Sequence, residues 1–199
     1  MNRLLLSTFV LLFSGSAFAE TDVQMLYRNY DDSRTVVTSP SLDLSSTFNN
    51  DQQKVSAGYA QDVVTSSSAD VTTFSSSGTI HEERHEFSGG METVVPDGTL
   101  AIGYVQSDEH DYHSKIVSAG GTREFFTKNT VVGFGFASGD DTINSSANPT
   151  FDERMRNQVY SLSLTQILSK KSLIQFLYDF RVENGYLASP YRKAKFDDG

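Results

Sequence analysis

The amino-acid sequence predicts an all-β protein. We expect an antiparallel up-and-down meander of about eight to ten strands, of the transmembrane β-barrel type, with the barrel incomplete. Three observations predict it. Bulky residues alternate with small or polar ones along most of the chain after residue 20. Short and long connections alternate. Several predicted strands reach about fifteen residues, whereas strands of soluble proteins usually have ~5–6.

The first 19 residues have the features of a secretory signal peptide. Arg3 gives a positive start, an apolar run of about ten residues follows, and Ala17-Phe18-Ala19 forms an A-x-A cleavage site. The run is too short to be a membrane-spanning helix. We therefore expect cleavage after Ala19 and a mature domain over residues 20–199.

Alternation with a period of two is clearest in five stretches and moderate in four more. The clear ones are residues 52–62, 99–106, 130–138, 158–168 and 172–183. Residues 22–30, 36–48 and 80–94 also indicate strands, and residues 112–126 indicate a strand whose facing is ambiguous. The count is nine, whereas bacterial barrels normally have an even number of strands. We therefore expect a barrel domain that is truncated at its C-terminus.

The connections fall into two groups. Tight turns are expected at residues 49–51, 96–98, 127–129 and 169–171, where Asn, Asp, Gly, Pro and Lys gather. Longer polar stretches are expected at residues 31–34, 63–79, 107–111, 139–153 and from 184 onward. Outer-membrane barrels place short turns on the periplasmic side and longer loops outside.

Composition excludes several classes of protein. Without Arg3 the chain has 15 basic and 25 acidic residues, a net charge of 15 − 25 = −10, which argues against nucleic acid as a partner. Cysteine is absent, so no disulfide stabilises an exported domain. After the first 19 residues no stretch approaches the ~20 apolar residues of a membrane helix.

The residues His81 to His85 read HEERH, the spacing of a zinc-peptidase signature. Zinc binding by this motif requires a helix, which brings both imidazoles to one ion. Ser and Gly flank the motif and no apolar helical stripe is present. We therefore expect a strand, with His81, Glu83 and His85 in one row. No catalytic residue, cofactor or metal site is expected.

A second polar stretch, residues 108–113, is rich in carboxylate and imidazole groups and leaves cation binding open. If the domain is a barrel, the inward-facing row includes charged residues of both signs. These candidate lumen-facing residues are Lys54, Asp62, Asp179 and Arg181. They would either tune permeation or form structural ion pairs.

Several blocks in order resemble an uncharacterised Gram-negative outer-membrane β-barrel family known only as a domain of unknown function, number 3570. The blocks are residues 62–70, 83–86, 107–114, 128–130, 165–169 and 184–192. The resemblance covers about residues 50–195 and the N-terminal half of the family. It implies an outer-membrane barrel, further strands after the last block, and no established activity.

The function expected from the sequence is the N-terminal portion of an outer-membrane β-barrel, with a channel or structural role and no catalysis. Its partners would be outer-membrane lipid and either a second chain or a missing C-terminal half that completes the barrel. The alternative is a soluble periplasmic β-sandwich binding module. The face formed by Ile174, Phe176, Tyr178 and Phe180 separates the two, because a barrel turns it to lipid and a sandwich buries it.

Overall fold

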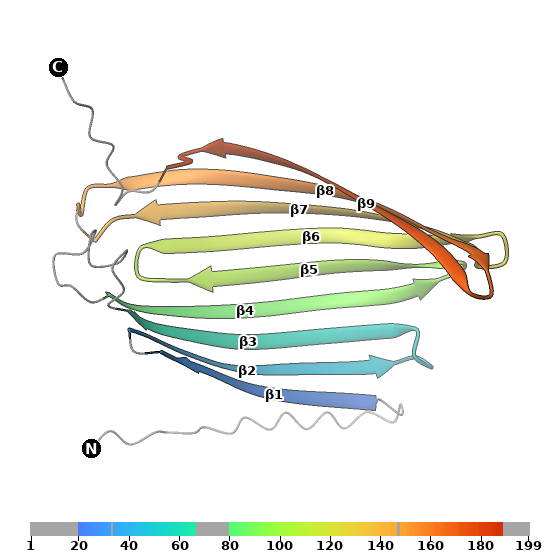
Figure 1. Ribbon diagram of the computed structural model, residues 1–199, viewed down its shortest axis with the longest axis horizontal. Helices are drawn as coiled ribbons and strands as arrows, with labels where there is room; N and C mark the ends of the chain where they lie inside the picture. The colour runs from blue at the N-terminus through green and yellow to red at the C-terminus, as the bar shows by residue number, and fades with distance from the viewer. Residues whose placement is uncertain (1–19, 33, 67–79, 147, 189–199) are drawn as a thin grey trace.

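The computed structural model describes residues 20–32, 34–66, 80–146 and 148–188, in which nine antiparallel strands form one sheet in sequence order (Figure 1). The strands are β1 (Glu20–Asp31), β2 (Thr35–Phe48), β3 (Gln53–Ser66), β4 (Ile80–Val95), β5 (Gly98–Asp108), β6 (Tyr112–Phe125), β7 (Thr130–Asn144), β8 (Asp152–Ser169) and β9 (Ser172–Gly185). The predicted all-β meander of nine strands is confirmed. The predicted signal peptide lies outside the described residues.

The sheet is open. β1 is hydrogen-bonded to β2 and β9 to β8, and in the described residues neither edge strand has a second neighbour. The described strands are therefore not closed into the barrel that the sequence predicts. No helix in the described ranges is long and apolar enough to cross a membrane.

Two kinds of connection lie at opposite ends of the sheet (Figure 1). Residues 49–52, 96–97, 126–129 and 170–171 form the tight turns of one end, as predicted. Asn49, Asn50 and Asp51 adopt positive φ angles of 57°, 55° and 62°, which Asn and Asp tolerate better than most residues. We call this the turn end, and the opposite end the loop end.

The expected difference in connection length is only partly correct. β3, β5 and β7 continue through polar residues that had been expected to form loops, so the connection at residues 109–111 is as short as the tight turns. The connection at residues 32–34 is equally short and differs little from the expected 31–34. The prediction failed because polar residues can still pair across strands, as Asp108 does with His113. Residues 145–151 remain a longer connection, and residues 67–79 lie outside the described part.

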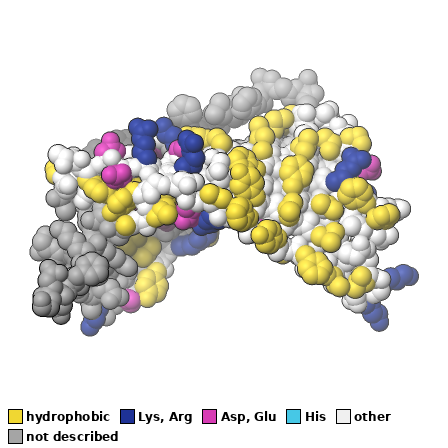
Figure 2. All heavy atoms as spheres, turned by 90° about the horizontal axis from the view of Figure 1, so that it is seen from above, with side chains coloured by type: hydrophobic (Ala, Val, Ile, Leu, Met, Phe, Trp, Pro, Cys, Tyr) yellow, Lys and Arg dark blue, Asp and Glu magenta, His cyan; other side chains and the backbone are white. Residues whose placement is uncertain are grey.

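The sheet is a single layer and has almost no core. Among the described residues Ile143, at 8% exposure, is the one buried hydrophobic side chain. The molecule arches in Figure 2, and its hydrophobic side chains gather in a continuous area on the surface shown. Folded domains normally bury such a surface against a second layer. The described residues contain one sheet, so they do not form the two-sheet sandwich of the alternative prediction.

Candidate functional site

The register of the strands sorts the side chains onto two unlike faces. Paired residues in an antiparallel sheet lie on the same face, so each face can be followed from β1 to β9. Two hollows, of about 440 and 340 Å³, are lined mainly by residues of one face. We call this the concave face and the opposite one the convex face.

The convex face carries an apolar band across all nine strands. On each strand three or more alternate positions hold apolar or small residues. The larger members of the band are Val23, Met25, Tyr27, Leu42, Leu44, Val55, Tyr59, Phe87, Met91, Leu100, Ile102, Tyr104, Val117, Val132, Phe134, Phe136, Tyr160, Leu162, Leu164, Ile174, Phe176, Tyr178 and Phe180. Ile102, Leu162 and Phe176 are 63%, 58% and 64% exposed. A patch of this extent is unusual on a soluble monomer.

Charged residues are excluded from the convex face over nine or more residues on nearly every strand. The uncharged stretch covers at least nine residues on eight strands, for example 87–95 on β4, 98–106 on β5, 130–138 on β7 and 158–166 on β8. β6 is the exception, because Lys115 and Arg123 limit its uncharged stretch to residues 117–121. A tilted strand that crosses a bilayer needs ~9–11 residues.

The band also runs obliquely across the strands. The cross-strand row that starts at Met25, in the middle of the band on β1, reaches Arg156 on β8. The middle of the band on β8 is Leu162, six residues further along. Six residues span about 20 Å along a strand, and seven strand spacings span about 34 Å across the sheet. The strand direction therefore makes an angle of about 30° with a line drawn at right angles to the band. This angle is near the ~35–45° tilt of strands in outer-membrane barrels.

The centre of the concave face is made of small residues, whereas large apolar side chains such as Leu26 and Leu177 lie on its edge strands. In the middle of β4 to β8 its side chains are Gly90, Ala101, Gly103, Ser118, Gly120, Gly133, Gly135, Ala137, Ser161 and Ser163. The smaller hollow lies over this floor. The larger hollow lies beside it on β1 to β5, and its lining includes Asp22, Asp43, Lys54 and Glu92.

All four charged residues predicted to face a lumen share the concave face. Lys54 and Asp179 even fall in the same cross-strand row, although five strands separate β3 from β9. Asp62 forms an ion pair with Arg84 of β4, and its Oδ2 accepts a hydrogen bond from Arg84 Nε at 3.0 Å. The guanidinium of Arg181 lies 3.7 Å from the carboxylate of Glu183. The structure therefore places the four residues on one face without bringing them into one cluster.

Sequence reasoning missed Asp141, which had been expected in a loop. It lies on the concave face of β7 and is 2% exposed. Its Oδ2 accepts a hydrogen bond from Asn157 Nδ2 at 3.0 Å, whereas the buried Oδ1 has no partner at normal distance in the described part of the chain. Burial, followed by a hydrogen bond to Asp141, raises the pKa of Tyr112. In the sequence, residues 139–144 read GDDTIN and show no alternation of apolar with polar residues, so no local signal placed this segment in a strand.

Carboxylates crowd the loop end of the concave face. Burial, followed by the nearby charges of Asp111 and Glu109, raises the pKa of Glu82 above its usual range. Burial also raises the pKa of Glu109, with Asp111 and Asp62 adding to the shift and Arg84 opposing it. Among the described residues no group of three or more His, Asp or Glu is placed to hold a metal ion.

The HEERH residues lie in β4, as the strand prediction stated, and not in a helix. His85 Nδ1 lies 2.9 Å from the Tyr59 hydroxyl, and His81 Nδ1 lies 3.0 Å from the Thr65 hydroxyl. Both imidazoles are therefore engaged with β3 on the convex face, and the helical geometry of a zinc peptidase is missing.

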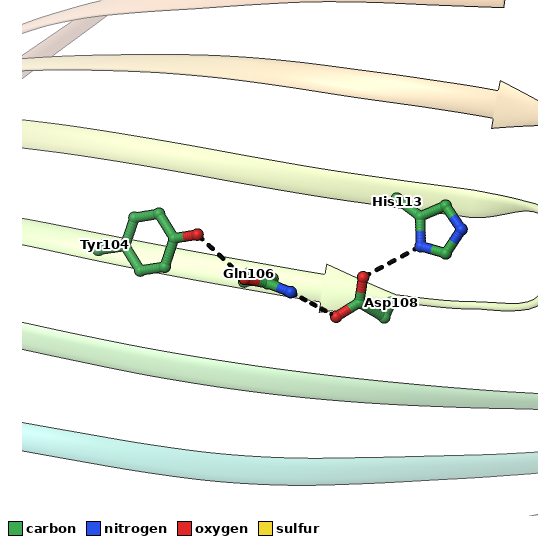
Figure 3. A network of polar contacts seen from close by, with 4 residues as sticks. All are labelled: Tyr104, Gln106, Asp108 and His113. Carbon is green, nitrogen blue, oxygen red and sulfur yellow. Dashed lines mark hydrogen bonds and ion pairs between the residues drawn. The ribbon is translucent and has the colours of Figure 1, made fainter.

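The polar stretch at residues 108–113 is divided between the two faces. On the convex face a chain of contacts links Tyr104, Gln106, Asp108 and His113 (Figure 3). Gln106 Nε2 donates to Asp108 Oδ2 at 2.7 Å, and His113 Nδ1 lies 3.0 Å from Asp108 Oδ1. These two hydrogen bonds, that from Gln106 first, lower the pKa of Asp108. Glu109 instead lies near Arg84 and Asp62 of the concave face. Among the described residues, the stretch therefore does not bring three cation ligands together.

Comparison with known proteins gives one match. No curated protein and no solved structure matches the chain. The model of a family described as "Protein of unknown function (DUF3570)" matches residues 75–161, which run from just before β4 into β8. The match includes three of the blocks that suggested the resemblance, residues 83–86, 107–114 and 128–130. The chain is thus similar to this family over those residues.

Proposed function

We propose that the chain is the N-terminal portion of an outer-membrane β-barrel that is exported by a signal peptide cleaved after Ala19. The observation that carries the proposal is the direction of curvature. In a soluble barrel or sandwich the apolar side chains meet inside the bend, whereas here they lie on the convex face and the small and polar residues lie on the concave face. Membrane barrels have this inverted arrangement, with lipid outside and water inside.

Two further observations support a membrane rather than a protein partner for the band. Uncharged stretches of at least nine residues correspond to the thickness of a bilayer. The oblique course of the band is what a flat membrane requires of tilted strands. A second protein layer would require neither this minimum length on eight strands nor this slope.

The edges of the sheet support a C-terminal continuation as the segment that completes the barrel. β1 and β9 run in the same direction, so an antiparallel closure needs an odd number of additional strands. A second copy inserted in the same orientation would place its β1 parallel to β9. Unpaired edges in lipid cost several kcal/mol for each unsatisfied backbone group. We therefore propose that further strands of the same polypeptide complete the barrel rather than a second copy.

Paired single-cysteine variants test the proposal, because the chain has no cysteine. Phe176 and Leu177 are neighbours on β9, are 64% and 72% exposed, and face opposite sides of the sheet. A fluorophore on Phe176→Cys in outer-membrane fractions should be quenched by brominated lipid, and the same label on Leu177→Cys should not. Each variant is first checked for sedimentation with the outer membrane and for heat-modifiable gel mobility. Protein in the soluble periplasmic fraction, with neither label quenched, would overturn the proposal.

A further inference from the structure

The two faces differ strongly in charge. On the concave face the nine strands carry twelve acidic and four basic residues, a balance of 4 − 12 = −8. The acidic residues are Glu20, Asp22, Asp43, Asp62, Glu82, Glu86, Glu92, Glu124, Asp141, Glu153, Asp179 and Glu183, and the basic ones are Arg28, Lys54, Arg84 and Arg181. On the convex face five acidic residues nearly balance four basic ones, which gives 4 − 5 = −1. These residues are Asp31, Glu83, Asp108, Asp140, Asp152, Lys115, Arg123, Arg154 and Arg156.

The side chains of the concave face leave room for solvent and ions. Glycine, alanine and serine cover its centre, and the two hollows of about 440 and 340 Å³ lie over this face. Eight strands make a barrel whose side chains can fill it, whereas larger barrels enclose water. Nine strands with a floor of small residues therefore indicate a wet interior.

The carboxylates of this face lack sufficient cationic partners. Asp141 is 2% exposed, and within the described residues its Oδ1 has no hydrogen-bond partner at normal distance. The groups that do interact with its carboxylate, the Asn157 amide and the Tyr112 hydroxyl, carry no positive charge. Carboxylates that repel one another in a partly desolvated place are stabilised by a cation. Because no three described ligands converge on one point, the geometry favours loosely held, mobile cations over one tightly bound metal ion.

We propose that the concave face attracts small inorganic cations, and that it gives the completed barrel a lumen that passes K⁺ in preference to Cl⁻. This inference rests on the proposed barrel and names the class of solute. The acidic residues on both sides of the uncharged centre would concentrate cations and repel anions.

The test uses the full chain, extracted from outer membranes and reconstituted in planar bilayers under a KCl gradient. The wild-type protein should give a reversal potential of the sign expected for K⁺. The variant Asp43→Asn with Glu92→Gln removes two charges that line the larger hollow and should lower the cation-to-anion permeability ratio by roughly twofold or more. The matched variant Asp31→Asn with Asp152→Asn removes two charges from the convex face and should leave the ratio unchanged.

The outcomes separate this inference from the proposed function. Outer-membrane fractionation and heat-modifiable mobility of every variant establish whether a membrane protein has folded. Inserted protein that conducts no ions, prefers anions, or responds equally to both double variants would overturn the cation inference and leave the barrel standing. Protein that never enters the outer membrane would overturn the barrel itself.

Discussion

The two faces of the sheet are built from neighbouring residues of the same strands, yet their side chains differ in size, polarity and charge. The convex face holds large apolar side chains and excludes charge over about the thickness of a bilayer. The concave face holds small side chains in its centre and twelve of the seventeen carboxylates that lie in the strands. Since successive residues of a strand point to opposite faces, one segment can satisfy both environments.

The difference shows that hydrophobic alternation alone does not locate the inside of a β-protein. In most sheets the apolar face is the one that is covered by the rest of the chain. Here no other described residues cover that face, and it bends outward, as the proposed contact with lipid requires. Three predictions test this difference between the faces.

The largest effect should come from placing a charge in the apolar band. Leu162→Arg lies at the middle of the band on β8 and should destabilise the protein by about 2–4 kcal/mol, because Arg would be moved into hydrocarbon. The matched variant Ser161→Arg places the same charge on the concave face and should cost much less. Urea unfolding in lipid vesicles, followed by tyrosine fluorescence, measures both. An equal loss in the free energy of unfolding of the two variants would contradict the proposal that the two faces meet different surroundings.

A smaller effect is expected from adding one carbon to the concave floor. A Cβ atom at Gly120 of β6 would lie 2.8 Å from the carbonyl oxygen of Phe134 and 3.4 Å from the Cα of Gly135. Gly120→Ala should therefore cost about 1–3 kcal/mol through crowding of the backbone. At Gly135 the added atom would meet Ser161 Cβ at an ordinary 3.4 Å, so Gly135→Ala serves as the control. The same unfolding assay applies, and a Gly120→Ala variant as stable as Gly135→Ala would contradict the close approach.

The smallest effect concerns the pH dependence of stability at the loop end. There the carboxylates Glu82 and Glu109 should contribute to stability with the opposite pH dependence from Asp108 on the convex face. The raised pKa values of Glu82 and Glu109 mean that the folded state binds more protons than the unfolded state above the usual carboxyl pKa. Their contribution to stability is therefore lost as the pH rises through the raised values. The lowered pKa of Asp108 works the other way, and its contribution is lost as the pH falls below the usual carboxyl pKa.

The free energy of unfolding at pH 7 therefore distinguishes the surroundings of Glu109 from those of Asp108. The Glu109→Gln variant should be more stable than the wild type, and the Asp108→Asn variant should be less stable, by less than about 1 kcal/mol because this pair is exposed. The variant Asp97→Asn at the turn end serves as a control for the general loss of one negative charge. A change of the same sign in the Glu109 and Asp108 variants would contradict the different surroundings of the two carboxylates.

The strand positions were largely predictable because they depend on local alternation. All nine predicted strands correspond to observed ones, and the row of Ile174, Phe176, Tyr178 and Phe180 lies on one face as expected. The ends of the strands were not predictable, since polar residues such as Asp140 and Asp141 look like loop residues until a partner strand is known. For the same reason the buried Asp141 was missed.

Local patterns in the sequence predicted which residues share a face within each strand and where the chain turns. They also predicted that Lys54, Asp62, Asp179 and Arg181 oppose the apolar rows. Those features depend on the period of two and on the conformational preferences of turn residues, and both are local. Only the tertiary structure decided the direction in which the sheet bends, the oblique course of the band, and the row that joins Lys54 to Asp179. These features depend on the register between strands, which is set by contacts between residues far apart in the chain.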